Sequence, residues 1–281
     1  YYSNWTGVDI GTVGEGKIRS VYNAERNLVP FRYNQPFDLY VFRLPHKIIV
    51  SYGDRAADNV AAFAGRLDVG ASRQEISALI HTVFGQKPRE NLKFVYTRLS
   101  EETAGAVALR RCDFELYHEF VLRIHPQIKE NEEDRAWLRD YFLKNVDLGF
   151  FCAVMHDGQI VSCSDAPGMP YMESLVQEIG INTLEEYRRR GYATQVCRLT
   201  VRNIIQAGKC PLWSTGASNR ASEILAYRCG FEKYADVYAK NSDLVGWISI
   251  PGTRIDYPVM QTKDNPNFYL KHAFDKSYSC L

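Results

Sequence analysis

The sequence lacks the features that would place it in a membrane, outside the cell or on a nucleic acid. No apolar run approaches the ~18 residues that a membrane-spanning helix needs, and no signal-peptide pattern is visible. The formal net charge is only +1, and no second basic cluster with interleaved aromatic residues occurs, which argues against nucleic-acid binding. From these absences we expect a cytoplasmic protein that has neither a membrane nor a nucleic acid as partner.

The cysteines also lack the spacing of a metal site or of a disulfide framework. The seven are odd in number, scattered, and never in C-x-x-C spacing: Cys112, Cys152, Cys163, Cys197, Cys210, Cys229 and Cys280. This pattern favours a reducing compartment, and several of them, with apolar neighbours, are expected to be small buried side chains. His118 and His156 have no partner at metal-ligand spacing. We therefore predict that the protein holds no metal.

The composition itself is that of an ordinary globular protein. The 281 residues are 46% hydrophobic and 24% charged, so the chain can form one large or two ordinary domains and bury a sizeable core. The first residue is Tyr1 rather than methionine, which is compatible with a fragment or a processed product.

The first third of the chain predicts a domain of its own, residues 1–104, of the α/β type. Its opening thirty-odd residues have no clear pattern. After them, apolar and aromatic runs predict strands and helical spacing predicts helices, in the order strand 37–45, strand 47–53, helix 55–67, helix 72–85 and strand 91–99. Ser72 and Glu75 form a capping-box pattern, and Gly85 closes the same helix.

Residues 105–232 predict a second domain in which helices cover a mixed sheet. The expected order is a short strand within 102–112, helices 114–124 and 132–146, a hairpin 149–166, a strand 173–183, a helix 191–208, a strand 210–217 and a helix 220–230. Asp113 and Asn219 stand where helix N-caps are expected. The fold class is therefore α/β, in the mixed α+β sense.

Three arginines stand directly before a glycine in the stretch EEYRRRGYATQV (185–196). The helix that follows offers unpaired amides and the positive end of its dipole. Gly191 lets the backbone approach a ligand closely, and Ala193 keeps the first turn uncluttered. We predict a pyrophosphate cradle of main-chain amides from Arg189 to Thr194, to which the arginines add local positive charge. The alternative is a solvated basic start of a helix.

The pattern Arg188-x-x-Gly191-x-Ala193 resembles the acetyl-CoA-binding motif of GNAT-superfamily N-acetyltransferases. NRASEILAYRCGF (219–231) is similar to a later element of that superfamily, and FFCAVMHDGQIVS (150–162) to its second and third strands. These matches, in the superfamily's order, cover about 105–231 and imply the GNAT acyl-CoA-binding fold.

The resemblance also implies which residues contact acetyl-CoA, the expected co-substrate. The pantetheine arm would pair with the strand around Ile179 to Thr183, the pyrophosphate would lie on the turn, and Asn219 would add a further contact unless it acts only as a helix cap. The cofactor-binding candidates are Ile181, Thr183, Arg188, Arg189, Arg190, Gly191, Tyr192, Ala193, Thr194, Asn219 and Ser222.

For catalysis, the resemblance implies that an amine attacks the thioester while a base removes its proton. Glu178 is the candidate base; the alternative is an ordinary strand carboxylate, and a bulge would exchange its role with that of Gln177. The superfamily's general acid, a tyrosine, would follow Leu225, but Ala226 stands there. Tyr227 comes one place, about 100° of helix, too late, so Tyr227, Tyr192 or water would protonate the thiolate.

Residues 233–281 resemble the start of the catalytic domain of class B sortases. The resemblance rests on NSDLVGWISIPGT, IDYPVMQTKDN and FYL, and implies a lead-in helix followed by short β-strands. The sortase histidine, cysteine and arginine lie beyond this point in that family, and His272 and Cys280 do not occupy their motif positions. We therefore expect an incomplete, non-catalytic tail. A truncated, fused or misassembled reading frame is one hypothesis for it.

The sequence thus predicts a bacterial N-acetyltransferase that transfers the acetyl group of acetyl-CoA to a primary amine, expected to be a small molecule, by direct attack. The 1–104 block would shape the acceptor pocket or mediate homodimerisation. One alternative is a non-catalytic acyl-CoA-binding protein, and another is a fragment of a surface transpeptidase.

Overall fold

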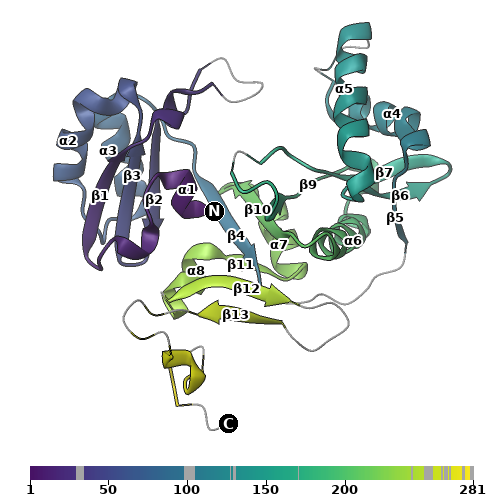
Figure 1. Ribbon diagram of the computed structural model, residues 1–281. Coiled ribbons are helices and arrows are strands. Elements are labelled where there is room, and N and C mark those ends of the chain that lie inside the picture. The colour runs from purple at the N-terminus through teal and green to yellow at the C-terminus, as the bar shows by residue number, and fades with distance from the viewer. Residues whose placement is uncertain are drawn as a thin grey trace. The chain divides into compact units, whose positions relative to one another are not determined.

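The computed structural model describes residues 1–29, 35–97, 105–126, 128, 131–169, 171–241, 243–249, 256–260, 262, 265, 267–273 and 276–278 (Figure 1). The chain forms two compact units, each assembled from separate stretches of sequence. Unit 1 comprises Tyr1–Glu90, Tyr234–Val245 and Met260–Leu281, and unit 2 comprises Asn91–Lys233 and Gly246–Val259. The mixed α+β class expected from the sequence is confirmed.

Unit 1 is built on a three-stranded sheet in the order β1-β3-β2, in which β1 runs parallel and β2 antiparallel to β3. Its elements are α1 (Tyr2–Thr6), η1 (Ile10–Thr12), β1 (Lys17–Tyr22), η2 (Ala24–Asn27), β2 (Leu39–Leu44), β3 (Lys47–Tyr52), η3 (Asp54–Ala56), α2 (Ala57–Arg66), α3 (Arg73–Phe84), α8 (Tyr234–Lys240) and η7 (Phe268–Leu270). Strand β1 falls in the stretch for which the sequence had no clear pattern.

The two long helices of unit 1 pack on the sheet through one apolar core. Ile48 and Val50 of β3 meet Val60, Phe63 and Ile76 of the helices, and all five are buried. Alternate residues of a strand and every third or fourth residue of a helix face the same way, which places these side chains together.

The ends of α3 follow the prediction from the sequence. Ser72 accepts a hydrogen bond from the Glu75 amide while the Glu75 carboxylate accepts one from the Ser72 amide, a complete capping box. Gly85 closes the helix with φ +68°, a left-handed conformation.

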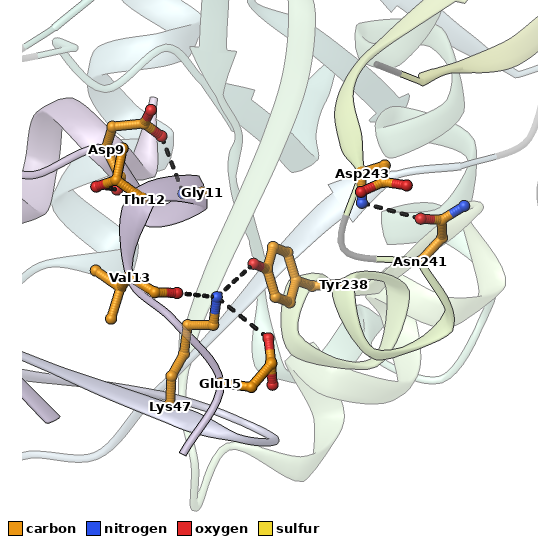
Figure 2. Close-up of polar contacts among 9 residues, drawn as sticks. All are labelled: Asp9, Gly11, Thr12, Val13, Glu15, Lys47, Tyr238, Asn241 and Asp243. Atoms are coloured by element: carbon orange, nitrogen blue, oxygen red, sulfur yellow. Dashed lines mark hydrogen bonds and ion pairs between the residues drawn. The ribbon is translucent and has the colours of Figure 1, made fainter. Parts of the chain in front are cut away.

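Helix α8 belongs to unit 1, although the sequence grouped it with the sortase-like tail. Its Tyr234 ring packs on Tyr2 and Phe42, with centroid distances of 4.7 and 5.9 Å. Its Tyr238 hydroxyl accepts a hydrogen bond of 2.9 Å from the buried Lys47 ammonium (Figure 2). Lys47 also donates to the Val13 carbonyl and lies 3.3 Å from a Glu15 carboxylate oxygen. A buried charge is tolerated only with such hydrogen-bond and ion-pair partners. Helix α8 therefore supplies one of the partners that stabilise the buried Lys47 ammonium.

Unit 2 contains two four-stranded sheets, β5-β6-β7-β9 and β11-β4-β10-β8. Its elements are β4 (Asn91–Tyr96), β5 (Ala106–Ala108), η4 (Arg111–Asp113), α4 (Phe114–Ile124), α5 (Glu132–Asn145), η5 (Val146–Leu148), β6 (Cys152–His156), β7 (Gln159–Asp165), β8 (Val176–Glu178), β9 (Gly180–Thr183), η6 (Glu185–Tyr187), α6 (Tyr192–Gln206), β10 (Cys210–Gly216), α7 (Arg220–Arg228) and β11 (Phe231–Lys233). The order expected for 105–230 is present, except that the single strand expected at 173–183 is divided into β8 and β9, which belong to different sheets.

Strand β4 occupies a place that local sequence did not indicate. The expectation grouped residues 91–99 with the amino-terminal domain, whereas β4 lies between β10 and β11 and runs antiparallel to both. After Gly230 the structure has β11, which includes Phe231, before α8 begins. Strand β4 is thus an inner strand of the β11-β4-β10-β8 sheet, although it precedes the other three strands in the chain.

The core of unit 2 buries four of the seven cysteines. Cys152, Cys163, Cys197 and Cys229 are each at most 2% exposed, as the apolar surroundings of several predicted. Burial raises the pKa of the Cys152 thiol to about 11 and that of Cys163 well above its ordinary value. The thiols of Cys152 and Cys163 are therefore neutral packing groups rather than nucleophiles. Cys280 lies outside the described residues.

The rest of the tail forms a two-stranded sheet of β12 (Leu244–Ser249) and β13 (Asp256–Met260). No helix among the described residues is long and apolar enough to cross a membrane. The same residues contain no group of three or more histidine, cysteine or acidic side chains that could hold a metal ion.

Candidate active site

The two sheets of unit 2 separate between β8 and β9, which follow one another directly in the chain. Strand β8 pairs in parallel with β10 only as far as Glu178 opposite Leu212, and the Ile179 amide still donates to the Leu212 carbonyl at 3.1 Å. From Gly180 onward the chain pairs instead with β7, as β9. Strand β10 continues to Gly216 on its own course. Within the part of the chain that the structure describes, no strand pairs with the other main-chain edge of β9, or with the edge of β10 beyond Leu212 that β4 does not use.

Gly180 stands where the chain changes sheets, opposite Asp165 of β7. A Cβ atom at this position would lie 2.0 Å from a carboxylate oxygen of Asp165, the residue opposite it on β7. The three nearest atoms that this Cβ would meet all belong to the Asp165 side chain, so a larger residue at position 180 would require that carboxylate to move.

The turn after β9 presents unpaired amides at the start of α6. Arg189 and Gly191 are both left-handed, with φ of +63° and +83°. Thr194 and Gln195 donate to the Gly191 carbonyl, but among the described residues nothing accepts from the amides of Arg189 to Ala193. A Cβ at Gly191 would meet no atom within 4 Å. Consecutive free amides beside open space and a helix N-terminus form an anion-binding concavity.

Two of the three arginines brace this turn. The Arg188 Nε donates to the Thr183 carbonyl at 3.2 Å, and the Arg190 Nη2 donates to the Glu186 carbonyl at 3.1 Å while its guanidinium lies over the Tyr187 ring. All three side chains are exposed. They contribute positive charge, but two of them also fix the backbone that carries the free amides.

Candidates on β9 and α7 make structural contacts of their own. The Thr183 hydroxyl is 2.8 Å from that of Ser162 on β7, and Ile181 packs at the edge of the core. Asn219 caps α7 by accepting from the Ser222 amide at 3.1 Å, and the Ser222 hydroxyl accepts from the Trp213 indole. The cap predicted for Asn219 is therefore present, whereas a contact of Asn219 or Ser222 with a ligand stays a prediction.

Asp113 caps differently from the expectation. It occupies the N-cap position of α4, but its side chain makes no cap hydrogen bond to that helix. Its carboxylate accepts from the Arg110 amide at 2.8 Å instead and closes the preceding 3-10 turn.

Glu178 lies at the parting point, half-buried, and its carboxylate accepts a hydrogen bond from the Ser214 hydroxyl of β10. Gln177, on the opposite face, is 4% exposed and donates to the carbonyls of Pro167 and Glu178. Of the two candidates, only Glu178 keeps an ionisable group at the opening between β9 and β10.

Tyr227 lies on the other face of the same sheet. Its ring meets Phe94 of β4 edge-on at 5.6 Å, and the Lys233 ammonium lies 5.9 Å from it. Successive strand residues face opposite ways, so Tyr227 is separated by the sheet from Glu178. Ala226, at the position where the resemblance expects tyrosine, is fully buried. Tyr192, in the first turn of α6, is half-buried against the core.

One polar residue at this site was not anticipated from the sequence. Lys93 of β4 stands opposite Ser214 in the register of the sheet, and burial lowers its pKa. The available signal was a lysine inside the otherwise apolar strand NLKFVY. The strand sequence does not show that Ser214 is the neighbour of Lys93, because the pairing of β4 with β10 joins residues more than a hundred positions apart.

The comparisons with known proteins agree with this geometry. The sequence model of a family described as GNAT acetyltransferase matches residues 59–238, well over half of the chain. Residues of the tail match Sortase B of Listeria monocytogenes, with 44% identity over 43 residues, 15% of this chain and 17% of that protein. The chain therefore spans less than a fifth of the length of that curated relative, and a sortase-like origin of the tail stays a prediction.

Solved structures with a similar fold include an acetyltransferase of the GNAT family from Colwellia psychrerythraea, with 14% identity, coverage of 64% of this chain and 69% of the other, and a TM-score of 0.44. A GCN5-related N-acetyltransferase from Sphaerobacter thermophilus has 17% identity, coverage of 58% and 54%, and a TM-score of 0.46. At these values neither likeness bears on the chemistry of this chain.

The family match stands on its own, and it includes the parting strands and the glycine turn described above. Members of that family use acetyl-CoA as co-substrate. The chain therefore belongs to the GNAT acetyltransferase family.

Proposed function

We propose that the enzyme acetylates a primary amine of a small molecule by direct attack, with acetyl-CoA held at the turn before α6 and Glu178 as the general base. The observation that carries the proposal is the row of unpaired amides from Arg189 to Ala193, beside open space at Gly191 and next to the opening between β9 and β10.

The residues present fit acetyl-CoA in chemistry and in order along the site. The free amides and the exposed arginines suit the charge of the pyrophosphate. The open edge of β9, which includes Ile181 and Thr183, suits the amide groups of the pantetheine arm, because an extended chain with donors and acceptors adds to an unpaired strand edge. The thioester would then lie toward the parting point, where Glu178 stands.

When bound, acetyl-CoA supplies the acetyl group as an activated thioester. The amine nitrogen attacks the carbonyl carbon, a C–N bond forms, and the C–S bond breaks with its electron pair remaining on sulfur. Glu178 accepts the proton that the nitrogen loses. Because Tyr227 lies across the sheet, we assign the proton gained by the leaving thiolate to Tyr192 or water. The products are an amide and the free thiol of coenzyme A.

Release of that thiol tests the proposal. The assay follows free thiol with acetyl-CoA and a panel of small primary amines, and mass spectrometry identifies the acetylated product. For the best amine we expect Glu178→Gln, which keeps the shape of the side chain, to lower kcat by about 10²–10⁴-fold, the usual contribution of a general base. The acetyl-CoA affinity should stay the same. Undiminished turnover by Glu178→Gln would refute the base assignment.

A non-catalytic acyl-CoA-binding protein is the second candidate, and Ala226 favours it, because this buried methyl group replaces the tyrosine that the resemblance expects. The same assay separates the two candidates. A binder without activity releases no thiol above the uncatalysed rate with any amine, while acetyl-CoA still binds.

A further inference from the structure

The short helix η6 directly precedes residues 188–193, here called the phosphate turn, and its side chains anchor it to distant parts of unit 2. The Tyr187 hydroxyl accepts a hydrogen bond of 3.1 Å from the Gln159 amide at the start of β7. The Tyr187 ring also packs on His156 of the β6-β7 hairpin, with ring centroids 5.2 Å apart. Tyr187 therefore joins η6 to the hairpin through both its ring and its hydroxyl group.

Arg123, near the carboxyl-terminal end of α4, joins the same two elements. Its Nη1 donates to the Gln159 side-chain oxygen at 2.8 Å, and its Nη2 donates to the Glu186 carboxylate of η6. The Gln159 side chain thus uses its oxygen for Arg123 and its nitrogen for Tyr187. Because a guanidinium presents its donors in a rigid plane, these two bonds fix the position of η6 relative to the start of β7.

The phosphate turn folds back on the anchored helix η6. The Arg190 guanidinium lies 5.1 Å from the centroid of the Tyr187 ring, and its Nη2 donates to the Glu186 carbonyl at 3.1 Å. Arg189 is left-handed, with φ +63°, and a residue other than glycine keeps such a conformation only when its surroundings hold it. The contacts of Arg190 with η6 close the turn around Arg189 and so oppose its relaxation.

We propose that Tyr187 and Arg123 are positioning residues for acetyl-CoA binding: they hold η6, and through Arg190 the phosphate turn, in the conformation that presents its free amides to the pyrophosphate. This inference rests on the proposed function, because it takes the turn as the acetyl-CoA site. A ligand that meets a preformed turn does not bear the cost of ordering it. Without these contacts only a fraction of the molecules would hold the amides in place, and the apparent Kd would rise as that fraction falls.

The test measures the acetyl-CoA Kd by isothermal titration calorimetry, and also KM for acetyl-CoA and kcat with the best amine. Tyr187→Leu removes the hydroxyl group and the ring that contacts His156 and Arg190, and should raise Kd and KM by roughly 3- to 30-fold. Tyr187→Phe keeps the ring and should stay within about threefold of the wild type. Arg123→Met, at a half-exposed side chain, should raise both values by about 2- to 10-fold and keeps the test decisive if Tyr187→Leu does not fold.

The split between KM and kcat distinguishes a positioning role from a general loss of structure. At saturating acetyl-CoA, kcat should stay at the wild-type value in all three variants, because the proposed chemistry takes place at Glu178 and not at the turn. A smaller amount of folded protein would instead lower kcat and leave KM unchanged. If the protein binds acetyl-CoA without catalysis, the Kd alone decides.

Arg111 provides a matched control, because its guanidinium makes a comparable surface ion pair with Asp147, which joins η4 to η5 in the same unit. Arg111→Met should leave the Kd unchanged. Wild-type Kd values for both Tyr187→Leu and Arg123→Met would overturn the proposal, and so would a lower kcat with an unchanged KM, or an equal rise in Kd for Arg111→Met. Gly191→Ala separates this failure from that of the proposed function. If Gly191→Ala alone raises the Kd, only the positioning role is refuted; if no variant raises it, the turn is not the acetyl-CoA site.

Discussion

Replacement of Gly191 by alanine separates the cost of backbone strain from the cost to ligand binding. Gly191 has φ +83°, and Gly208, just beyond α6, has φ +75°. A Cβ at either position would meet no atom within 4 Å. An L-residue in this left-handed region costs about 1–2 kcal/mol. Gly191→Ala and Gly208→Ala should therefore lower the free energy of unfolding by similar amounts, measurable by urea denaturation.

The two variants should differ only in how they bind acetyl-CoA. At Gly191 the new methyl group would enter the space beside the free amides of Arg189 to Ala193. Loss of one hydrogen bond to a charged phosphate oxygen costs about 1.5–3 kcal/mol, which corresponds to a roughly 10- to 100-fold rise in Kd. Gly208→Ala should bind acetyl-CoA like the wild type.

Isothermal titration calorimetry of both variants with acetyl-CoA provides the comparison. Equal Kd values for Gly191→Ala and Gly208→Ala, whether or not they match the wild-type value, would contradict a phosphate site at Gly191, because both variants would then differ from the wild type only by backbone strain.

Three further predictions concern stability and reactivity. Tyr238→Phe removes a hydrogen-bond acceptor from Lys47, which is 3% exposed. The variant should therefore lower the free energy of unfolding by about 1.5–3 kcal/mol. An unchanged denaturation midpoint would show that this contact of α8 does not stabilise the fold. Hydrogen bonds from Lys233 and Arg220 lower the pKa of Glu223. The contribution of Glu223 to the free energy of unfolding is therefore complete above the ordinary carboxyl pKa and is lost as the pH falls through the lowered value. Glu223→Gln should make the free energy of unfolding fall less steeply with decreasing pH, and an equally steep fall would contradict this. The exposed Cys112 should react with a thiol reagent at pH 8 before Cys152, whose pKa of about 11 keeps it neutral. Peptide mapping that finds Cys152 modified first in the folded protein would show that burial does not protect its thiol.

The parts of the fold that follow from the sequence depend on contacts between near neighbours. The capping box at Ser72, the left-handed Gly85 and the Asn219 cap each involve residues at most a few positions apart. Such patterns are readable because one short stretch contains both partners. The turn at Gly191 is of the same kind, since its strand, glycine and helix are consecutive.

The parts that could not be predicted depend on pairing between distant segments. Strand β4 was recognised as a strand, but nothing in NLKFVY states that β10 and β11 are its neighbours. The position of Lys93 opposite Ser214 was missed for the same reason, because the two residues belong to distant segments. Helix α8 was assigned to the tail since its sequence resembles a sortase lead-in, whereas Tyr2, Phe42 and Lys47 of unit 1 determine where it packs.

The most direct test of the proposed site is a crystal structure of the chain in complex with coenzyme A. We predict that the pyrophosphate oxygens lie within hydrogen-bond distance of amide nitrogens between Arg189 and Ala193, with the pantetheine arm along the unpaired edge of β9. A pyrophosphate bound elsewhere, with those amides facing only solvent, would contradict the proposed acetyl-CoA site.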